Sequence, residues 1–236
     1  MQPHSRRKTT RSLAMDNQFI HCFPPQTSIV KAPPDMWTTP LCAAEEALIE
    51  GAREKRQREF RAGRHAAHKA LARLEAPFEA LLRGDKRQPL WPHGYLGSIS
   101  HCQEVCLAVC ARTTDLAGLG VDVEPLKPLP KGVSRYVHTP REEVFMQHNP
   151  ELPERLVFSA KESLYKCYYP ILGQFIGFQA VNLEINPMAQ TFGFSTSPES
   201  DIPFPEALQF HGCFAMDGTH LYTGCYLSHG NIQREN

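Results

Sequence analysis

Three acidic residues in two short segments carry the most informative chemistry of this sequence. Asp122 and Glu124 belong to the segment Gly-Val-Asp-Val-Glu at 120–124, and Glu162 belongs to Phe-Ser-Ala-Lys-Glu-Ser-Leu-Tyr-Lys at 158–166. Residues two apart on a strand point to the same side, so Asp122 and Glu124 would bring two carboxylates together. Such carboxylates repel one another unless a cation lies between them or one is protonated. With Glu162 as a third ligand they would suit Mg²⁺, although two solvated acids at a strand end are the structural alternative.

The segment 158–166 is predicted to be helical. Ser159 and Glu162 form a capping-box pattern, and apolar residues recur at helical spacing at Ala160, Leu164, Cys167 and Ile171. Glu162 and Lys166 stand four apart, which places a carboxylate and an ammonium on one helix face. A capped surface helix with an ordinary ion pair would have the same pattern, so its meaning depends on the rest of the chain.

Groups that bind anions lie upstream of the acids. Residues 43–74 are rich in good helix formers and carry a cationic set, namely Arg53, Lys55, Arg56, Arg58, Arg61, Arg64, His65, His68 and Lys69. Such a run is either a solvated face or an anion site. Ser100-His101, where a predicted loop enters a strand, supplies a hydroxyl and an imidazole that could both hydrogen-bond an anion. A nucleophilic serine is not expected, because the sequence has no G-x-S-x-G elbow. Together these groups predict a site for a phosphorylated, metal-bound ligand.

The elements that position these residues form two rounds of helices followed by strands. Helical pieces are predicted within 43–74, with breaks at Gly51 and Gly63, and strands over 102–112 and 117–124. Helices are predicted after Thr139-Pro140, which supplies an N-cap and a first-turn proline, and over 153–169. Short strands are predicted at 178–185, 191–197, 208–216 and 220–227, with Asp217-Gly218 as a hairpin turn. This order predicts an α+β protein with an N-terminal half over 17–115 and a C-terminal half over 116–236.

Composition limits the classes of partner and compartment. The 236 residues carry 25 basic and 25 acidic side chains, so no overall field recruits nucleic acid or an anionic membrane. No apolar run approaches the ~18 residues of a membrane span, and residues 1–16 are basic and polar without the apolar core of a secretory signal. We therefore expect a cytoplasmic protein with a disordered extension over 1–16.

The eight cysteines are scattered along the chain, so we expect reduced thiols. Cys102, Cys106 and Cys110 follow the period of a strand and are expected to pack on one strand face. Such a row is too long for a single metal ion, because each strand residue rises ~3.4 Å. A cysteine-ligated metal or cluster is the weaker alternative.

The two acidic segments resemble the two signature motifs of the 4'-phosphopantetheinyl transferases, in order and in separation. Three further motifs resemble the longer, monomeric surfactin-type members, especially the branch of enterobactin synthase component D: Arg58-x-Phe60-x-x-Gly63-Arg64, Arg87-x-Pro89-x-Trp91-Pro92 and Gly97-Ser98-Ile99-Ser100-His101. The resemblance is strong over roughly 45–170 and loose beyond it. It implies a pseudo-dimer of two similar α+β halves, each with helices packed on a small antiparallel sheet, and a ligand cleft between them.

The resemblance also implies an activity, which is transfer of the phosphopantetheine arm of coenzyme A to a serine of an acyl or peptidyl carrier protein. Adenosine 3',5'-bisphosphate would be released. Asp122, Glu124 and Glu162 would hold Mg²⁺ against the pyrophosphate. Glu162 would also take the proton of the serine hydroxyl, and Lys166 would complete the catalytic set with Asp122 and Glu162. The alternative is a catalytically silent module that keeps the pocket for coenzyme A or a nucleotide.

For the phosphates of coenzyme A, the resemblance implies a larger set, namely Arg53, Arg56, Arg87, Ser100, His101, Lys161 and Lys166. The basic faces around Arg58, Arg61 and Arg64 are expected to dock the carrier protein, which is usually acidic. Some members have a further acid that Glu142 or Glu143 could match, and the pattern does not choose between them.

Overall fold

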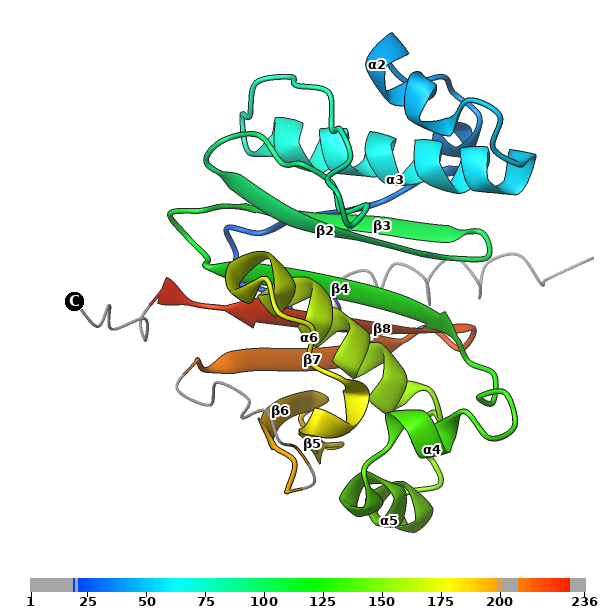
Figure 1. Cartoon of the computed structure of the whole chain (residues 1–236), viewed down its shortest axis with the longest axis vertical. Helices are drawn as coiled ribbons and strands as arrows, with labels where there is room; N and C mark the ends of the chain where they lie inside the picture. The colour runs from blue at the N-terminus through cyan, green and yellow to red at the C-terminus, as the bar shows by residue number, and fades with distance from the viewer. Residues whose placement is uncertain (1–18, 20, 199, 201–207, 230–236) are drawn as a thin grey trace, which may run out of the picture.

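Two antiparallel sheets with helices packed on them form the molecule, which confirms the α+β class (Figure 1). The computed structural model describes residues 19, 21–198, 200 and 208–229. Within these residues the first sheet has the order β1-β3-β2, with β1 at Ser28–Lys31, β2 at Tyr95–Cys102 and β3 at Val105–Arg112. The second sheet has the order β4-β8-β7-β6-β5, and its strands are β4 (Gly118–Pro125), β5 (Val181–Asn186), β6 (Thr191–Thr196), β7 (Phe210–Met216) and β8 (His220–Leu227).

The described helices fall into two groups, one for each sheet. The N-terminal half has α2 (Ala43–Glu46), α3 (Glu54–Arg73) and the 3₁₀ turns η1 (Pro34–Trp37) and η2 (Ala47–Ile49). The C-terminal half has α4 (Ser134–Val137), α5 (Pro140–His148), α6 (Leu156–Leu172) and the 3₁₀ turn η3 (Phe178–Ala180). We propose that one half gives way to the other near residue 116, since β3 ends the first sheet before that point and β4 opens the second after it. The predicted extension over 1–16 lies outside the described residues.

Helix α3 covers the first sheet through a row of small side chains. Ala62, Ala66 and Ala70 are fully buried and pack with Cys106 and Cys110 of β3. Burial raises the pKa of the Cys106 thiol to about 12, which keeps it a neutral packing group. The expected single cysteine face is wrong in one respect, because Cys102 ends β2 and lies on a different strand.

The two predicted helix breaks within 43–74 had different outcomes. Gly51, with a φ of +71°, lies between η2 and α3 and is a break as predicted. Gly63 lies inside α3, so the second predicted break is wrong. A Cβ at Gly63 would lie 2.9 Å from Cγ2 of Ile99 on β2, so glycine is needed there for close packing of helix on strand.

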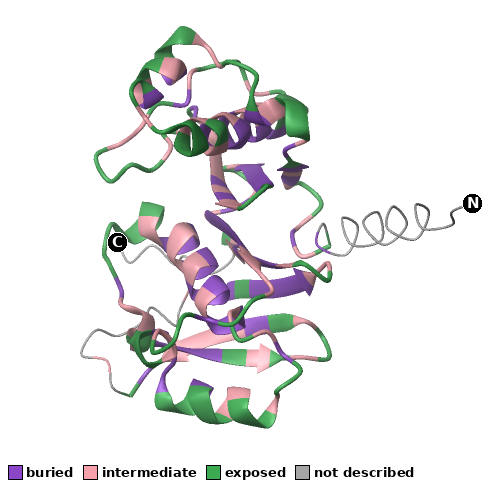
Figure 2. Cartoon of the chain, turned by 90° about the vertical axis from the view of Figure 1, so that its right-hand side faces the viewer, coloured by how far each residue is buried: buried purple, intermediate pink, exposed green. Residues whose placement is uncertain are grey.

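A shared core joins the halves. Leu107 and Val109 of β3 pack in one cluster with Val121 and Val123 of β4. The buried residues accordingly concentrate in the strands and on the inner faces of the helices, with exposed residues on the outer helices (Figure 2). The strand β4 is therefore covered on one side by the first sheet and on the other by α6 (Figure 1).

One cysteine pair departs from the expectation of reduced thiols. Cys22 and Cys213 form a disulfide, with Cα atoms 5.6 Å apart. The two residues are separated by 191 positions, and only the packing of the N-terminal segment on the second half brings them together. Spacing along the chain gives no sign of such a pair.

Helix α6 starts earlier than its capping pattern predicts. It begins at Leu156, so Ser159 lies inside the helix and the predicted capping box of Ser159 and Glu162 is wrong. The Ser159 hydroxyl instead donates to Asp122 Oδ2 at 2.8 Å. By contrast, Thr139 does cap α5, in a capping box with Glu142 and with Pro140 in the first turn as predicted.

The backbone of α6 lies directly on β4. A Cβ at Gly120 would lie 1.9 Å from the carbonyl oxygen of Ser163, and one at Gly118 would lie 2.8 Å from that of Cys167. Only glycine at these two positions lets the helix approach so closely. This approach brings Lys166 of α6 within hydrogen-bond distance of Asp122 on β4.

We expect Gly120→Ala to destabilise the fold by about 3 kcal/mol or more, because backbone atoms of α6 would have to move. Gly193→Ala on β6 is the matched control, since a Cβ there meets no heavy atom within 4 Å, and it should stay within about 0.5 kcal/mol of the parent. Urea unfolding followed by circular dichroism measures both. Equal midpoints for the two variants would contradict the close approach of α6 to β4.

Candidate active site between the two halves

Asp122 is the centre of a buried polar cluster built from three elements. Its Oδ1 accepts hydrogen bonds from Lys166 Nζ on α6 at 2.7 Å and from Ser100 Oγ on β2 at 2.8 Å. Its Oδ2 accepts from Ser159 Oγ, and the side chain is only 7% exposed. The structure therefore brings together Asp122, Ser100 and Lys166, which the sequence predicted for one site from three distant segments.

Glu124 follows on the same strand and is paired with a residue that the sequence analysis missed. Arg155 donates to Glu124 Oε2 at 2.5 Å, and also to the carbonyl oxygens of Lys127 and Pro128. Burial and the neighbouring Asp122 raise the pKa of Glu124, while Arg155 opposes that shift. The sequence did contain a signal for Arg155: it lies seven positions before Glu162, which is two helical turns away on the same face.

Glu162 lies half-buried on α6. Burial raises the pKa of its carboxyl, and the charges of Asp122 and Glu124 raise it further, against the effect of Lys166. The three predicted metal ligands therefore influence one another electrostatically. Among the described residues, no three His, Cys, Asp or Glu side chains lie close enough together to hold a metal ion. The oxygen donors of Asp122, Glu124 and Glu162 and the repulsion among their charges nevertheless fit a hard divalent cation.

A basic pocket of about 150 Å³, which we call the arginine pocket, lies on the other side of β2. Three predicted residues, Arg56, Arg87 and His101, line it, and Arg56 Nη1 lies 3.4 Å from His101 Nε2. Burial lowers the pKa of His101, and Arg56 and Lys166 lower it further, against the opposing effect of Glu59, whose Oε1 lies 3.8 Å from His101 Nδ1. Arg53 lies just before α3, outside the set that lines this pocket.

Two more arginines, Arg64 and Arg83, line the same pocket. Arg64 is 4% exposed, and its guanidinium lies 4.6 Å from the centre of the Phe60 ring. Burial lowers the pKa of Arg64 to about 10, and its buried Nε has no hydrogen-bond partner among the described residues. An anion in the pocket would compensate this cost. The recurrence of Arg56, Phe60 and Arg64 every four residues was the signal for one helix face.

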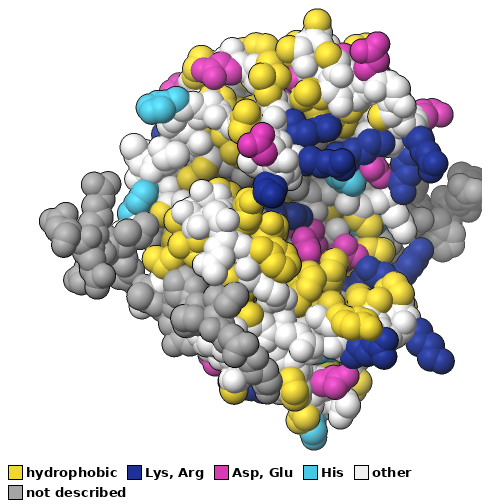
Figure 3. All heavy atoms as spheres, in the orientation of Figure 1, with side chains coloured by type: hydrophobic (Ala, Val, Ile, Leu, Met, Phe, Trp, Pro, Cys, Tyr) yellow, Lys and Arg dark blue, Asp and Glu magenta, His cyan; other side chains and the backbone are white. Residues whose placement is uncertain are grey.

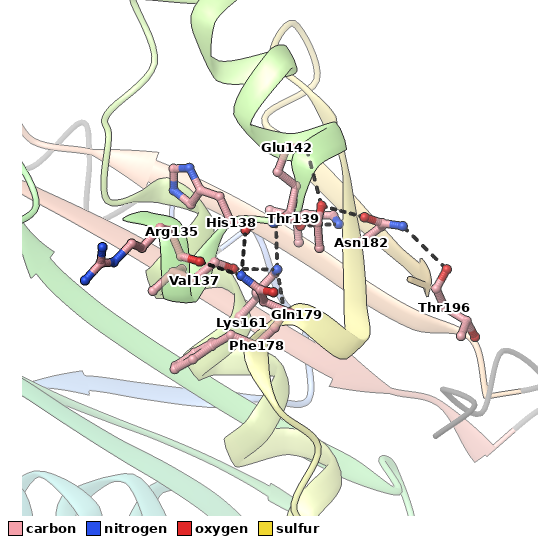
Figure 4. Close-up of polar contacts among 11 residues, drawn as sticks. Arg135, Val137, His138, Thr139, Glu142, Lys161, Phe178, Gln179, Asn182 and Thr196 are labelled. Carbon is pink, nitrogen blue, oxygen red and sulfur yellow. Dashed lines mark hydrogen bonds and ion pairs between the residues drawn. The ribbon is translucent and has the colours of Figure 1, made fainter. Parts of the chain in front are cut away.

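Lys161 has a different position from the one the resemblance implied. Its Nζ donates to Glu142 Oε2 at 2.7 Å, to the carbonyl oxygen of Val137 at 2.9 Å and to that of Phe178 at 2.6 Å (Figure 4). Because an ammonium has three protons and all three are used inside the protein, none is left for a phosphate. This corrects the expectation that Lys161 binds the phosphates of coenzyme A: it joins α6 to α5, α4 and η3.

An apolar pocket of about 160 Å³ lies beside Glu162. Its lining includes Tyr165, Phe175, Ile176 and Phe178. On the face that Figure 3 shows, acidic side chains lie between two groups of basic side chains, and hydrophobic side chains adjoin them. The surface near the site is thus basic, acidic and apolar in adjacent zones.

Two family models match this chain. The model of the 4'-phosphopantetheinyl transferase N-terminal domain matches residues 44–111, and that of the 4'-phosphopantetheinyl transferase superfamily matches residues 118–204. The chain belongs to this superfamily. The structure divides in the same way, since the first match ends within β3 and the second begins at β4.

Individual relatives agree with the family models. The chain is 40% identical over 164 residues to the 4'-phosphopantetheinyl transferase Svp of Streptomyces mobaraensis, which covers 67% of each chain. It is 35% identical over 157 residues to the transferase Npt of Nocardia iowensis, covering 66% of this chain and 69% of the relative. It is 39% identical over 124 residues to enterobactin synthase component D of Salmonella austin, covering 51% of each. Within the described part of the transferase chain, no helix has the length and apolar character that a membrane span requires.

We expect Glu162→Gln to stabilise this transferase at neutral pH by about 1 kcal/mol, the ordinary size of a single-residue effect. The folded chain holds the pKa of Glu162 above its unfolded value of 4.5, so the charged form opposes folding and stability is gained as pH falls through the raised pKa. The advantage of the variant should therefore shrink as the pH approaches 5. Urea unfolding at several pH values measures it, with the exposed Glu143→Gln as the control. A variant less stable than the parent at pH 7.5 would contradict the prediction.

Proposed function

We propose that this chain transfers the 4'-phosphopantetheine arm of coenzyme A to a serine of apo acyl or peptidyl carrier proteins, as an enzyme of the holo-[acyl-carrier-protein] synthase type. The observation behind this proposal is that a group of residues suited to a cation and a group suited to an anion lie on the two sides of strand β2. Ser100 on β2 contacts Asp122 and Lys166, while the next residue, His101, contacts Arg56 in the arginine pocket. Coenzyme A has a matching pair of anionic groups, the 3'-phosphate and the pyrophosphate.

The arginine pocket is the proposed site of the 3'-phosphate. Arg56, Arg64, Arg83 and Arg87 line it together with His101, and planar guanidinium groups bind phosphate through paired hydrogen bonds. Arg53 is kept only as a residue at the edge of this site, where its exposed side chain would add charge.

Mg²⁺ is assigned to Asp122, Glu124 and Glu162. The raised pKa values of Glu124 and Glu162 arise partly from repulsion among the three acids, which a divalent cation would relieve. When bound, the ion would neutralise charge on the pyrophosphate as the leaving group departs. Glu124 would then share its carboxylate between the ion and Arg155.

The chemical step exchanges one bond to phosphorus for another. The serine oxygen of the carrier protein bonds to the phosphorus that carries the pantetheine arm, and the bond from that phosphorus to the bridging oxygen breaks, which releases adenosine 3',5'-bisphosphate. Glu162 takes the proton of the serine hydroxyl directly or through water, and its raised pKa makes it a stronger base than an exposed glutamate. Lys166 supplies positive charge close to Asp122, where the leaving group gains negative charge.

The pantetheine arm has a place beside this step. The pocket next to Glu162 is lined largely by apolar and aromatic side chains, including Tyr165, Phe175 and Phe178. An uncharged arm of this size suits such a lining better than the arginine pocket does. The arm would then extend away from the pyrophosphate along α6.

The carrier protein needs a basic surface near Glu162. Of the expected residues, Arg61 pairs with Glu46 at 2.7 Å and Arg64 is buried, so only Arg58 remains exposed and unburdened by these contacts. The segment that follows Glu124 also exposes Lys127, Lys131 and Arg135. We infer that an acidic carrier docks across these basic groups and that the enzyme is a cytoplasmic monomer. Gel filtration with and without a carrier protein would test the monomeric state and the docking.

The deciding experiment is incubation of apo carrier proteins with the chain, coenzyme A and Mg²⁺, followed by intact mass measurement. We expect one phosphopantetheine per carrier, and at least a 100-fold slower transfer with Glu162→Gln at near-normal coenzyme A affinity. Glu143→Gln is the matched control and should retain full activity. Coenzyme A binding without any mass gain, across acyl and peptidyl carriers, would replace the proposal with a silent binding module.

We expect His101→Ala to weaken coenzyme A about 10-fold and dephospho-coenzyme A, which lacks the 3'-phosphate, by less than about 2-fold. A phosphate would favour the protonated imidazole whose pKa burial lowers, so coenzyme A binding should take up a proton and weaken as pH rises. Calorimetry in two buffers of different ionisation enthalpy measures both effects. The exposed His148→Ala serves as the control. Equal losses for the two ligands would remove His101 from the 3'-phosphate.

A further inference from the structure

Two edge strands face each other where the halves meet. In the described sheets, β2 lies at the edge of the order β1-β3-β2 and β4 lies at the edge of the order β4-β8-β7-β6-β5. The two strands pack together without belonging to one sheet. Edge strands leave backbone N–H groups unpaired, and buried ones need partners. The partners here are serine hydroxyls.

The hydroxyls form a regular row along β2. Val121 N donates to Ser98 Oγ at 3.1 Å, and Val123 N donates to Ser100 Oγ at 3.2 Å. Both pairs are 23 positions apart in the chain, so the strands run in parallel with a fixed register. One more step of the same register pairs Cys102 with Pro125, which has no N–H to donate. The serine hydroxyls thus serve the two middle steps of this register, at Val121 and Val123, whereas the step before them pairs Leu96 with Leu119 and offers no side-chain oxygen.

Ser100 has contacts that Ser98 lacks. Its hydroxyl donates to Asp122 Oδ1 at 2.8 Å and accepts from Lys166 Nζ at 3.2 Å, in addition to accepting from Val123 N. A hydroxyl has one proton and two lone pairs, so these three bonds use its full capacity. Ser100 is 5% exposed, and no hydrogen-bonding capacity remains for a ligand phosphate.

We propose that Ser100 is a positioning residue of the transferase, not a ligand of coenzyme A. It fixes the orientation of Asp122 and Lys166 by holding both to the same oxygen, and it ties them to β4 through Val123 N. Ser98 joins the same two strands but has no contact with the catalytic set. This inference rests on the proposed function, and it departs from the role that the family resemblance gives to Ser100.

The pair Ser98→Ala and Ser100→Ala tests it, because each substitution removes the acceptor of one buried N–H group. Both variants should unfold at a lower urea midpoint than the parent, and Ser100→Ala at the lower of the two, because it also removes the hydroxyl bonded to Asp122 and Lys166. Only Ser100→Ala should lower kcat for carrier modification, by about 10-fold or more, with the KM for coenzyme A changed less than about 3-fold. The preference for coenzyme A over dephospho-coenzyme A should stay unchanged in both variants. Calorimetric titration with Mg²⁺ alone, independent of turnover, should show weaker binding for Ser100→Ala than for Ser98→Ala.

Three outcomes have distinct meanings. A Ser100→Ala variant with normal kcat and a lost preference for coenzyme A over its dephospho form would make Ser100 a phosphate ligand and overturn the inference. Equal losses of kcat and equal Mg²⁺ affinities in the two variants would reduce Ser100 to a structural contact, which also overturns it. If the parent chain modifies no carrier protein, the proposed function fails, and the Mg²⁺ titration still decides whether Ser100 orients Asp122.

Discussion

The direct packing of α6 on β4 is the contact on which the rest of the structure depends. Gly118 and Gly120 remove the side chains that would otherwise hold the helix away, and the carbonyl oxygen of Ser163 lies where a Cβ would be. This approach brings Lys166 and Ser159 into hydrogen-bond distance of Asp122. A helix one side chain further out would deprive Asp122 of its two partners on α6. The geometry of the polar cluster around Asp122 therefore depends on the two glycines of β4.

The second constraint is electrostatic. Asp122, Glu124 and Glu162 influence one another electrostatically in a partly buried site, where burial and mutual repulsion raise the pKa values of Glu124 and Glu162. Arg155 and Lys166 offset part of this cost from either end of the cluster. On the far side of β2, the arginine pocket has an excess of positive charge, and the Nε atom of the buried Arg64 has no hydrogen-bond partner among the described residues. A ligand with both a metal ion and phosphates would relieve the two imbalances at once.

Not every charged group near the motifs belongs to this arrangement. Lys161 is next to Glu162 in the chain and five positions before Lys166. Five positions on an α-helix do not return to the same face, so Lys161 projects from a different face than Lys166. There it forms a buried ion pair with Glu142, whose other oxygen accepts from Leu183 N. The pair holds α5 and β5 against α6 (Figure 4), so it supports the helix that carries Glu162 without approaching the phosphate pocket.

The sequence by itself determined the α+β class, the two halves and the segments that meet at the site, because local periodicity and turn chemistry follow from nearest neighbours. It also placed Asp122 and Glu124 on one strand and Glu162 and Lys166 on one helix face. What it did not determine were contacts between distant segments. The disulfide of Cys22 with Cys213, the pairing of Arg155 with Glu124 and the burial of Arg64 each depend on how elements pack. Tertiary structure also shows contacts that local patterns do not: Ser159 resembles a helix cap and donates to Asp122, and Ser100 resembles a phosphate ligand and makes three hydrogen bonds inside the protein. A residue's type states which bonds it can form, and only the fold states which partners are within reach.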